Sequence, residues 1–539
     1  MRIFRALLLS ACAAGLLAGC GGGGSTGSSV NTSTTRGTLI QNPPLRVASV
    51  NVTDLTAQLQ SSQSGQQLQA IAGAPLCGID YHYIQYATVG GHGEATTATG
   101  VMMVPTGTAA PCTGQRPIVL YAHGTSTVKS FNLAAVGDPT NDAYSESALI
   151  GAMFAAQGYI VVAPNYAGYD ASTLPYHPYL NADQQSKDMI DALTAARSAL
   201  GHIFASGTTD NGQLFITGYS QGGHVAMATH KAMQALGLTV TASAPMSGPY
   251  AMAAFGDAVF FGDVNLGSTV FTPLLATSYQ QSYQNIYASP SDLFAAPYAA
   301  AGVATLLPSL TPLNTLFAQN SLPQTALFSS TAPSTNGASA TLDALFPTIT
   351  PPTTPAAEAP LFALGFASTN FLVNNTYRLA YVADAAATPD GAVPTVTTGM
   401  PPASPTNTLR QAFKANDLRG WSPTAPVLLC GGHADPTVFY PVNTGTVATI
   451  LTANSHVRAI DVDASTGYTA YGGALSAQVA NLEAALQPQF TATATAVATA
   501  AGGGATGQNA VVQAYHGTLV PPFCTKAAQA FFSGLYQLQ

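Results

Sequence analysis

Short apolar segments alternate with longer segments of helical character along most of the chain. Residues 81–88 alternate apolar and polar positions, as a half-buried strand does, and residues 95–104 are their expected antiparallel partner. Later apolar segments are mostly continuous, which is typical of parallel strands covered on both faces; they lie at 117–122, 159–163, 214–217, 240–247, 426–430 and 456–462. Helices are expected at 51–72, 146–157, 182–200, 438–453 and 525–535. This order predicts an α/β fold around a mostly parallel, doubly wound sheet.

The alternation fails between residues 249 and 410, where aromatic and alanine-rich pieces are separated by proline-rich runs. We interpret 249–410 as a helical cap or lid inserted between the two parts of the sheet domain, 51–248 and 411–539. An unrelated second module or a linker is the alternative. Residues 491–507, rich in alanine, threonine and glycine, are expected to form a loop without a core of its own.

The beginning of the chain has the pattern of an export signal, residues 1–20, followed by a flexible tether, residues 21–50. The signal ends in Leu17-Ala-Gly-Cys20, which resembles the bacterial lipobox. This resemblance implies that Cys20 is lipidated, and Gly21 in the next position implies the outer membrane of a Gram-negative cell. An ordinary signal peptide with an incidental cysteine is the alternative. No later stretch offers about 20 uninterrupted apolar residues, so a lipid anchor is the only membrane attachment expected.

Composition narrows the classes of partner. Charged residues make up 7% of the chain and hydrophobic residues 47%, so the chain can bury a large core. The net charge is −8, and it becomes more negative when the export signal with Arg2 and Arg5 is removed. Nucleic acid is therefore not an expected partner. The sequence carries no signal for an oligomeric state.

Four cysteines follow the export signal: Cys77, Cys112, Cys430 and Cys524. In an exported protein they allow three disulfide pairings. Their neighbourhood favours Cys77 with Cys112, around the first two strands, and Cys430 with Cys524, between two loops that carry candidate residues. Free buried thiols are the alternative.

One serine stands between an apolar run and a helix that extends to about Leu236, in Gly218-Tyr-Ser220-Gln-Gly222. Strand, sharp turn and helix form the context that a G-x-S-x-G nucleophile elbow requires, because the turn lifts the serine hydroxyl clear of the sheet. A Cβ at Gly218 or Gly222 would crowd the neighbouring strand or helix. The same pattern at residues 23–27 has no strand before it. Ser220 is therefore the candidate nucleophile, with a structural helix N-cap as the alternative.

A serine hydroxyl needs a base to take its proton, and the base needs a carboxylate to hold its tautomer. With this elbow the chain order is serine, acid, histidine. Asp435 follows a predicted strand, and His516 lies immediately before the last helix. Asp417 and Asp384 are rivals for the acid, and His456, which opens a strand, is the rival for the base.

Acyl transfer also needs hydrogen-bond donors for the tetrahedral oxyanion. One donor is expected to be the backbone N–H of Gln221, directly after the candidate nucleophile. The other is expected in His123-Gly124-Thr125, after the 117–122 strand. We favour the N–H of Thr125 over that of Gly124; an ordinary glycine turn is the alternative.

Together these motifs resemble those of secretory lipases of the α/β hydrolase superfamily. The motifs that carry the resemblance, in chain order, are His123-Gly-Thr125, Ala163-Pro-Asn-Tyr-Ala-Gly168, His177-Pro-Tyr-Leu180, Gly218-Tyr-Ser-Gln-Gly222, Asp435-Pro-Thr-Val438 and His516. The likeness covers about residues 77–539 and departs at Asn165, where that family often has Asp, and in the long Ala/Thr segment before His516. It implies an α/β hydrolase with a helical cap that hydrolyses lipid-like or other apolar carboxylic esters, with no metal and no organic cofactor.

Three functions are compatible with these motifs. The first is a lipid-anchored serine esterase or lipase with Ser220 as nucleophile, His516 as base and Asp435 as its acid. The second is a serine peptidase like prolyl oligopeptidase, which has the same type of sheet and the same triad. Two features count against a peptidase. Too few residues precede the first strand for the propeller domain of those enzymes, and the sequence has no cluster of charged residues that could hold a peptide terminus. The third is a non-catalytic surface lipoprotein that keeps the fold.

Overall fold

The computed structural model describes residues 35–203, 207–464 and 477–537. The expected export signal, Cys20 and the first part of the tether lie outside these residues. None of the helices in the described residues combines the length and the hydrophobicity that a membrane span requires.

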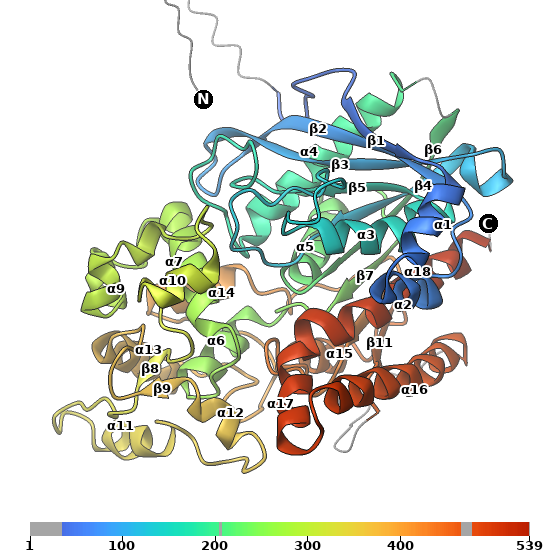
Figure 1. Ribbon diagram of the computed structural model, residues 1–539. Coiled ribbons are helices and arrows are strands. Elements are labelled where there is room, and N and C mark those ends of the chain that lie inside the picture. Colours follow the sequence, from blue (N-terminus) through green and yellow to red (C-terminus); the bar gives the residue numbers. More distant parts are fainter. Residues whose placement is uncertain (1–34, 204–206, 465–476, 538–539) are drawn as a thin grey trace, which may run out of the picture. The chain divides into compact units, whose positions relative to one another are not determined.

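A nine-stranded mixed sheet organises the protein (Figure 1). Its strands, in chain order, are β1 (Leu45–Val50), β2 (Gly78–Val89), β3 (Ala95–Thr106), β4 (Gly114–Ala122), β5 (Ile160–Pro164), β6 (Thr208–Tyr219), β7 (Ala242–Met246), β10 (Val427–Gly431) and β11 (Val457–Asp461). The order in the sheet is β1-β2-β3-β5-β4-β6-β7-β10-β11. The pairs from β1 to β5 are antiparallel, and all pairs from β5 to β11 are parallel. The predicted α/β fold with a mostly parallel sheet is confirmed.

Two groups of helices cover the sheet. One group is α4 (Ala182–Leu200) and α5 (Gln221–Ala235), which pack against each other and against the central strands. The other is α2 (Gln63–Ala72), α3 (Tyr144–Met153) and α18 (Val520–Gln537). Phe215 of β6 stacks on Phe532 of α18 with ring centroids 4.6 Å apart. Every residue of β5, β7 and β10 is buried, because helices cover both faces of the parallel part of the sheet.

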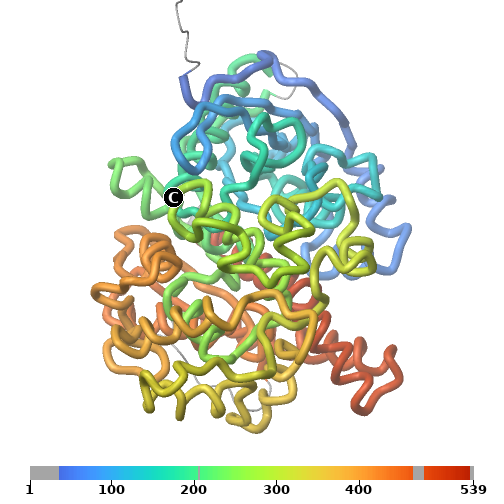
Figure 2. The backbone as a smooth tube through the Cα atoms, turned by 90° about the vertical axis from the view of Figure 1, so that its left-hand side faces the viewer, coloured from blue at the N-terminus to red at the C-terminus, as the bar shows by residue number. Residues whose placement is uncertain are grey.

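The cap is a mostly helical insertion with a hydrophobic core of its own. Its helices are α6 (Met252–Phe260), α7 (Ser268–Tyr283), α8 (Pro290–Leu293), α9 (Ala296–Ala300), α10 (Leu313–Ala318), α11 (Ala340–Leu345), α12 (Ala359–Ala363), α13 (Asn375–Ala387) and α14 (Thr408–Ala415), with a small parallel sheet of β8 (Phe328–Ser329) and β9 (Phe366–Ala367). Figures 1 and 2 both show this green-to-orange segment gathered beside the sheet. Helix α14, which spans the predicted boundary at residue 410, packs on α6 and α7.

Three local expectations differ from the structure. The predicted helix at 51–72 is two helices, α1 (Val52–Gln60) and α2, and between them the Ser62 side chain caps α2 by accepting from the N–H of Gly65 at 3.1 Å. The tether was predicted to reach residue 50, but β1 pairs with β2 along the sheet edge. Residues 491–507 were predicted to be a loop. They belong instead to helices α16 (Ala477–Ala500) and α17 (Gly504–Ala514) and the turn between them, because alanine is the strongest helix former.

Candidate active site

Ser220 occupies the sharp turn between β6 and α5. Its φ of 60° and ψ of −121° place its backbone in a region that L-residues rarely adopt. Space is also restricted around the turn: a Cβ at Gly222 would lie 1.9 Å from the carbonyl oxygen of Ala122, and one at Gly218 would lie 2.4 Å from the same oxygen. The backbone N–H of Ser220 donates to the carbonyl of Met246 at 3.0 Å, which ties the turn to β7. The geometry is that of a nucleophile elbow.

His516 links Ser220 to Asp435. Its Nε2 lies 2.8 Å from the Ser220 hydroxyl oxygen, and its Nδ1 lies 2.6 Å from Oδ2 of Asp435. Because the carboxylate can only accept, Nδ1 carries the proton and Nε2 is the acceptor of the serine hydroxyl. The other oxygen of Asp435 accepts the backbone N–H groups of Thr437 at 2.9 Å and Val438 at 3.0 Å, which fix the carboxylate. The three residues selected from the sequence thus form one hydrogen-bonded chain.

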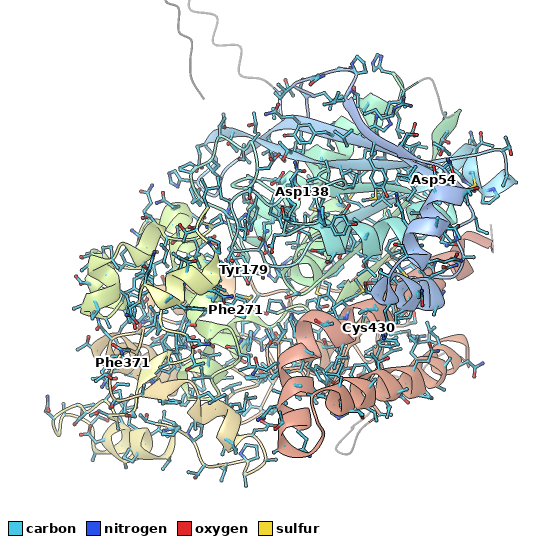
Figure 3. The ribbon with its side chains drawn as sticks, in the orientation of Figure 1. Asp54, Asp138, Tyr179, Phe271, Phe371 and Cys430 are labelled. Atoms are coloured by element: carbon cyan, nitrogen blue, oxygen red, sulfur yellow. A yellow bond between two sulfur atoms is a disulfide. The ribbon has the colours of Figure 1, made fainter. Side chains whose placement is uncertain are left out.

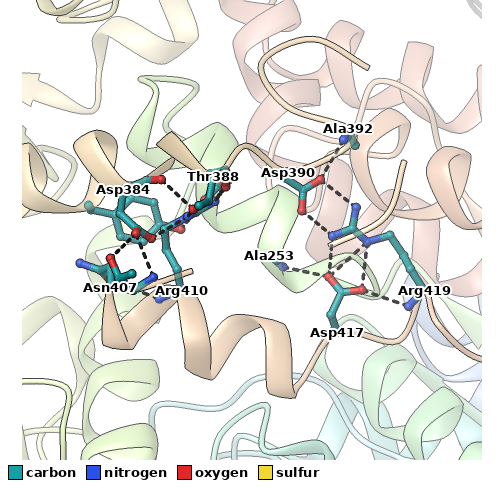
Figure 4. A network of polar contacts seen from close by, with 12 residues as sticks. Ala253, Asp384, Thr388, Asp390, Ala392, Asn407, Arg410, Asp417 and Arg419 are labelled. Atoms are coloured by element: carbon teal, nitrogen blue, oxygen red, sulfur yellow. Dashed lines mark hydrogen bonds and ion pairs between the residues drawn. The ribbon is translucent and has the colours of Figure 1, made fainter. Parts of the chain in front are cut away.

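The rival residues lie elsewhere. Asp417 pairs with Arg419 at 2.8 Å and Asp384 pairs with Arg410 at 2.7 Å, inside a buried ion-pair network that Figure 4 shows. His456 is exposed just before β11. In the described part of the chain, neither carboxylate contacts Ser220, and the imidazole of His456 does not contact it either.

Both expected disulfides are present, Cys77–Cys112 and Cys430–Cys524. Cys430, labelled in Figure 3, lies on β10 directly before the loop of Asp435. Cys524 lies on α18, shortly after His516. The second bond therefore joins the segment that carries the acid to the segment that carries the base.

The oxyanion donors that the sequence suggested are not equivalent. Among the described residues, the backbone N–H groups of Gln221 and Thr125 have no acceptor. The N–H of Gly124 donates to Oε1 of Glu146 at 3.1 Å. Because this N–H already has an acceptor, it does not suit the role of an oxyanion donor. Tyr121 donates to the same carboxylate oxygen at 2.7 Å, and burial raises the pKa of Glu146. Thr125 therefore stays as the second candidate, beside Gln221.

An apolar cavity of about 80 Å³ opens beside Ser220 and Gln221. Cap residues provide most of its wall, among them Met252, Phe255, Val259, Phe271 and Leu275. Tyr179 from the sheet domain and Phe271 from α7 line the same cavity, and Figure 3 shows them close together where the cap meets the sheet. No charged side chain is among the lining residues that the structure describes. The cavity suits an uncharged, apolar group.

Several supporting residues were not found from the sequence. The hydroxyl of Tyr219 donates to the backbone carbonyl of His516 at 2.7 Å. The hydroxyl of Tyr515 donates to Asp463 at 2.6 Å and accepts the N–H of Ala434 at 3.2 Å, beside the acid loop. Each tyrosine directly precedes a candidate catalytic residue, which is the only signal that the sequence offers for them.

Asn165, where secretory lipases often have Asp, connects loops close to residues 123–125, the segment expected to provide an oxyanion donor. Its Oδ1 accepts the N–H of Leu133 at 2.8 Å, and its Nδ2 donates to the hydroxyl of Thr99 at 2.9 Å. An aspartate could not make the second bond as a donor, so the departure fits this particular network. Among the residues with described positions, no three histidine, cysteine or acidic side chains are placed to hold a metal ion.

Comparisons with known proteins agree with this fold. The model of the prolyl oligopeptidase family matches residues 146–262, which contain the elbow. A ligand-bound form of the rice cell wall degrading esterase LipA from Xanthomonas oryzae is similar over 80% of this chain and 92% of that chain, with 26% sequence identity and a TM-score of 0.60. A putative hydrolase from Legionella pneumophila covers 93% of this chain and 99% of its own, with 18% identity and a TM-score of 0.58, and supports the fold alone. No curated protein matches the sequence. The chain is a member of the α/β hydrolase superfamily with an esterase-like structure.

Proposed function

We propose that this protein is a serine carboxylic-ester hydrolase, an esterase or lipase, that acts on apolar or lipid-like esters. The observation that carries the proposal is the chain of two hydrogen bonds, 2.8 Å and 2.6 Å, from Ser220 through His516 to Asp435. It lies at a strained elbow that opens into an uncharged cavity. These are the parts that acyl transfer to a serine requires.

In the proposed reaction, His516 Nε2 takes the hydroxyl proton as Ser220 Oγ attacks the ester carbonyl carbon. Asp435 holds the Nδ1 proton and stabilises the imidazolium that forms. The backbone N–H groups of Gln221 and Thr125 donate to the oxyanion of the tetrahedral intermediate. The imidazolium then returns the proton to the leaving alcohol. Water, activated by His516, hydrolyses the acyl-enzyme through a second tetrahedral intermediate and restores the serine.

The cavity would bind the part of the substrate next to the scissile bond. Its described lining is aromatic and aliphatic and carries no charge, so this part of the substrate is expected to be an apolar acyl or alkyl group. The similar Xanthomonas enzyme degrades rice cell wall, as its name states. Esters carried on plant cell-wall polymers therefore belong in the substrate panel beside simple acyl esters.

A serine peptidase is the second candidate, because the prolyl oligopeptidase family model matches the elbow region. Two features disfavour it. In the described chain before β2, residues 35–77 form one strand and two helices and no propeller. The described lining of the cavity has no charged side chain that could bind a peptide terminus.

The test measures p-nitrophenol release from esters with acyl chains from acetyl to palmitoyl, beside hydrolysis of cell-wall esters and a peptide panel. Ser220→Ala is expected to lower kcat on esters by about 10³-fold or more. Ser198→Ala, an exposed serine on α4, is the matched control and is expected to behave like the wild type. Peptide cleavage without ester cleavage would establish the peptidase. Inactivity on both classes would favour a non-catalytic surface protein.

We further propose that the protein is exported and lipid-anchored through Cys20. Two disulfides support an extracytoplasmic location, since the cytosol keeps thiols reduced. Labelled palmitate should be incorporated into the wild type and not into Cys20→Ser, which should leave the membrane fraction. Equal labelling of both proteins would contradict the anchor.

A further inference from the structure

The side chain of Gln221 is held by a single polar contact inside the protein. Gln221 is 1% exposed, and its amide nitrogen Nε2 lies 2.7 Å from Nε2 of His177. Its amide oxygen is buried and has no partner in the described part of the chain. The contact with His177 therefore fixes the orientation of the amide.

The proton positions at His177 follow from its second ring nitrogen. Nδ1 lies 2.9 Å from the carbonyl oxygen of Ala167, which can only accept, so Nδ1 carries the proton. Burial lowers the pKa of His177 to about 3, and the imidazole is therefore neutral near pH 7. Nε2 is then an acceptor, and it receives an amide N–H of Gln221.

The imidazole is itself held in place. Its ring centroid lies 4.6 Å from that of Tyr169. A Cβ on Gly168 would lie 2.6 Å from Cα of His177, so the two backbone segments are in close contact. The N–H of Ala167, whose carbonyl accepts from the imidazole, donates to Oδ2 of Asp188 at 2.6 Å. His177 thus presents its acceptor nitrogen at a fixed point.

The contact between Gln221 and His177 matters because the backbone N–H of Gln221 is the expected oxyanion donor. Gln221 is the first residue of α5, and N–H groups in the first turn of a helix have no acceptor within the helix. No helical hydrogen bond therefore sets the direction of this N–H. It depends on the Ser220 turn on one side and on the anchored Gln221 side chain on the other.

We propose that His177 is a positioning residue for oxyanion stabilisation: by holding the side chain of Gln221, it keeps the backbone N–H of that residue directed at the developing oxyanion. The inference rests on the proposed ester hydrolysis. His177 does not line the cavity beside Ser220, so it acts through Gln221 and not on the substrate.

Four variants and one control test the proposal. His177→Leu removes the acceptor, Gln221→Met removes the donor at nearly the same side-chain length, and the double variant removes both. His177→Gln returns a side-chain acceptor. His230→Leu is the control: His230 is a buried histidine of α5 whose Nδ1 lies 2.8 Å from the Ser243 hydroxyl, remote from the reacting groups.

We expect about tenfold lower kcat in His177→Leu and Gln221→Met, less than the 10²–10³-fold lost with a whole oxyanion donor. KM should stay within about twofold in His177→Leu, because His177 does not line the cavity and ground-state binding is not affected. A trifluoromethyl ketone forms a tetrahedral adduct with Ser220, and its affinity should fall by the same factor as kcat/KM. The double variant should be no worse than either single variant, because both remove one contact. His177→Gln should recover part of the loss.

A rise in KM at unchanged kcat would overturn the proposal, as would additive losses in the double variant or an equal loss in His230→Leu. If His177→Leu does not fold, Gln221→Met, which keeps the imidazole, decides through kcat and the affinity of the trifluoromethyl ketone. Ester hydrolysis that survives Ser220→Ala would contradict the proposed function itself, whatever the effect of His177.

Discussion

Tyr219 and His516 are joined by a hydrogen bond of 2.7 Å from the tyrosine hydroxyl to the histidine backbone carbonyl. Their rings also lie 5.1 Å apart, centroid to centroid. Tyr219 ends β6 and directly precedes Ser220, so the strand that carries the candidate nucleophile also holds the backbone of the candidate base. The distance between the serine oxygen and the imidazole is thereby set by the rigid sheet as well as by the π-helical turn Tyr515–Leu519, which holds His516 directly before α18.

Tyr219→Phe removes this bond and leaves a carbonyl of His516 without its partner. We expect kcat to fall by about five- to tenfold, which corresponds to the roughly 1–1.4 kcal/mol that one such hydrogen bond contributes. KM should hardly change, because Tyr219 does not line the cavity. Steady-state kinetics on a p-nitrophenyl ester measure both constants.

The control for this substitution is Tyr83→Phe on β2, which removes a comparable bond of 2.7 Å to Asp170. It should keep wild-type kcat. If Tyr219→Phe also keeps wild-type kcat, the turn alone positions His516 and the expectation is wrong.

Much of the site could be predicted from the sequence because local turn chemistry marks it. Ser220 stands between two glycines after an apolar run, and a Cβ at either glycine would collide with backbone. Asp435 follows a strand and His516 precedes the last helix, so chain order and loop position select both as candidates. Continuous apolar runs predicted most central strands within three residues of their observed ends, whereas β6 begins at Thr208, well before the run predicted at 214–217.

The rest depends on contacts that no local pattern encodes. Tyr219 and His516 are separated by 297 positions in the sequence. From the sequence, Gly124 is a candidate oxyanion donor, but in the structure Glu146, from α3, accepts its N–H. The difference at 491–507 has another cause: repeated alanine and threonine are typical of low-complexity loops, but alanine also has the highest helix propensity, and here helices form.

The Cys430–Cys524 disulfide closes a sequence separation of 94 residues. Replacing both cysteines with alanine should lower the free energy of unfolding by about 2–4 kcal/mol, because the unfolded chain gains conformational entropy. It should also lower kcat, since the bond joins the segments of Asp435 and His516. Urea unfolding and ester kinetics at a temperature well below the midpoint measure the two effects separately.

The Cys77–Cys112 bond, with a separation of 35 residues, is the matched control. Its double alanine variant should lose stability and keep kcat, because neither cysteine lies near Ser220. Full kcat after removal of Cys430–Cys524 would show that this bond contributes only stability.

Arg410 joins two helices of the cap through two buried carboxylates, and Figure 4 shows one of them, Asp384, beside it. Its guanidinium lies 2.8 Å from Asp257 on α6 and 2.7 Å from Asp384 on α13, and all three side chains are less than 10% exposed. Arg410→Leu leaves both carboxylates buried without their cation. The free energy of unfolding should fall by about 3–5 kcal/mol, the usual cost of breaking a buried ion pair from one side.

The control is Lys187→Ala, which removes the cation of an exposed pair with Asp183 on α4. Exposed pairs contribute less than about 1 kcal/mol, so this variant should unfold almost like the wild type. Because Asp257 follows Gly256, which lines the cavity, Arg410→Leu should also raise KM for long acyl esters more than for acetyl esters. A loss of stability no larger than that of Lys187→Ala would contradict the role assigned to Arg410.

Asp188 makes stability depend on pH, with a sign that its environment determines. Burial is the main reason that the pKa of Asp188 rises to about 7, although Tyr86 and the N–H of Ala167 donate to its two oxygens at 2.6 Å. In the unfolded chain an aspartate has a pKa of about 3.9. Between these two values the folded protein binds the proton and the unfolded chain does not. The contribution of Asp188 to stability is therefore present in full below about pH 4, is lost as pH rises to about 7, and changes no further above it.

Asp188→Asn removes this titration while keeping an oxygen that can accept from Tyr86 or Ala167. The difference in free energy of unfolding between the wild type and Asp188→Asn should shift by up to about 4 kcal/mol against the wild type from pH 4 to pH 7, since each pKa unit corresponds to about 1.4 kcal/mol. Other titrating groups, including nearby Asp191, are common to both proteins and largely cancel in this difference. Urea unfolding of both proteins at closely spaced pH values measures this difference. The difference in free energy of unfolding could instead stay constant from pH 4 to pH 8 or move in favour of the wild type as pH rises. Either result would mean that Asp188 is charged in the folded protein across this range, because its two hydrogen-bond donors outweigh its burial.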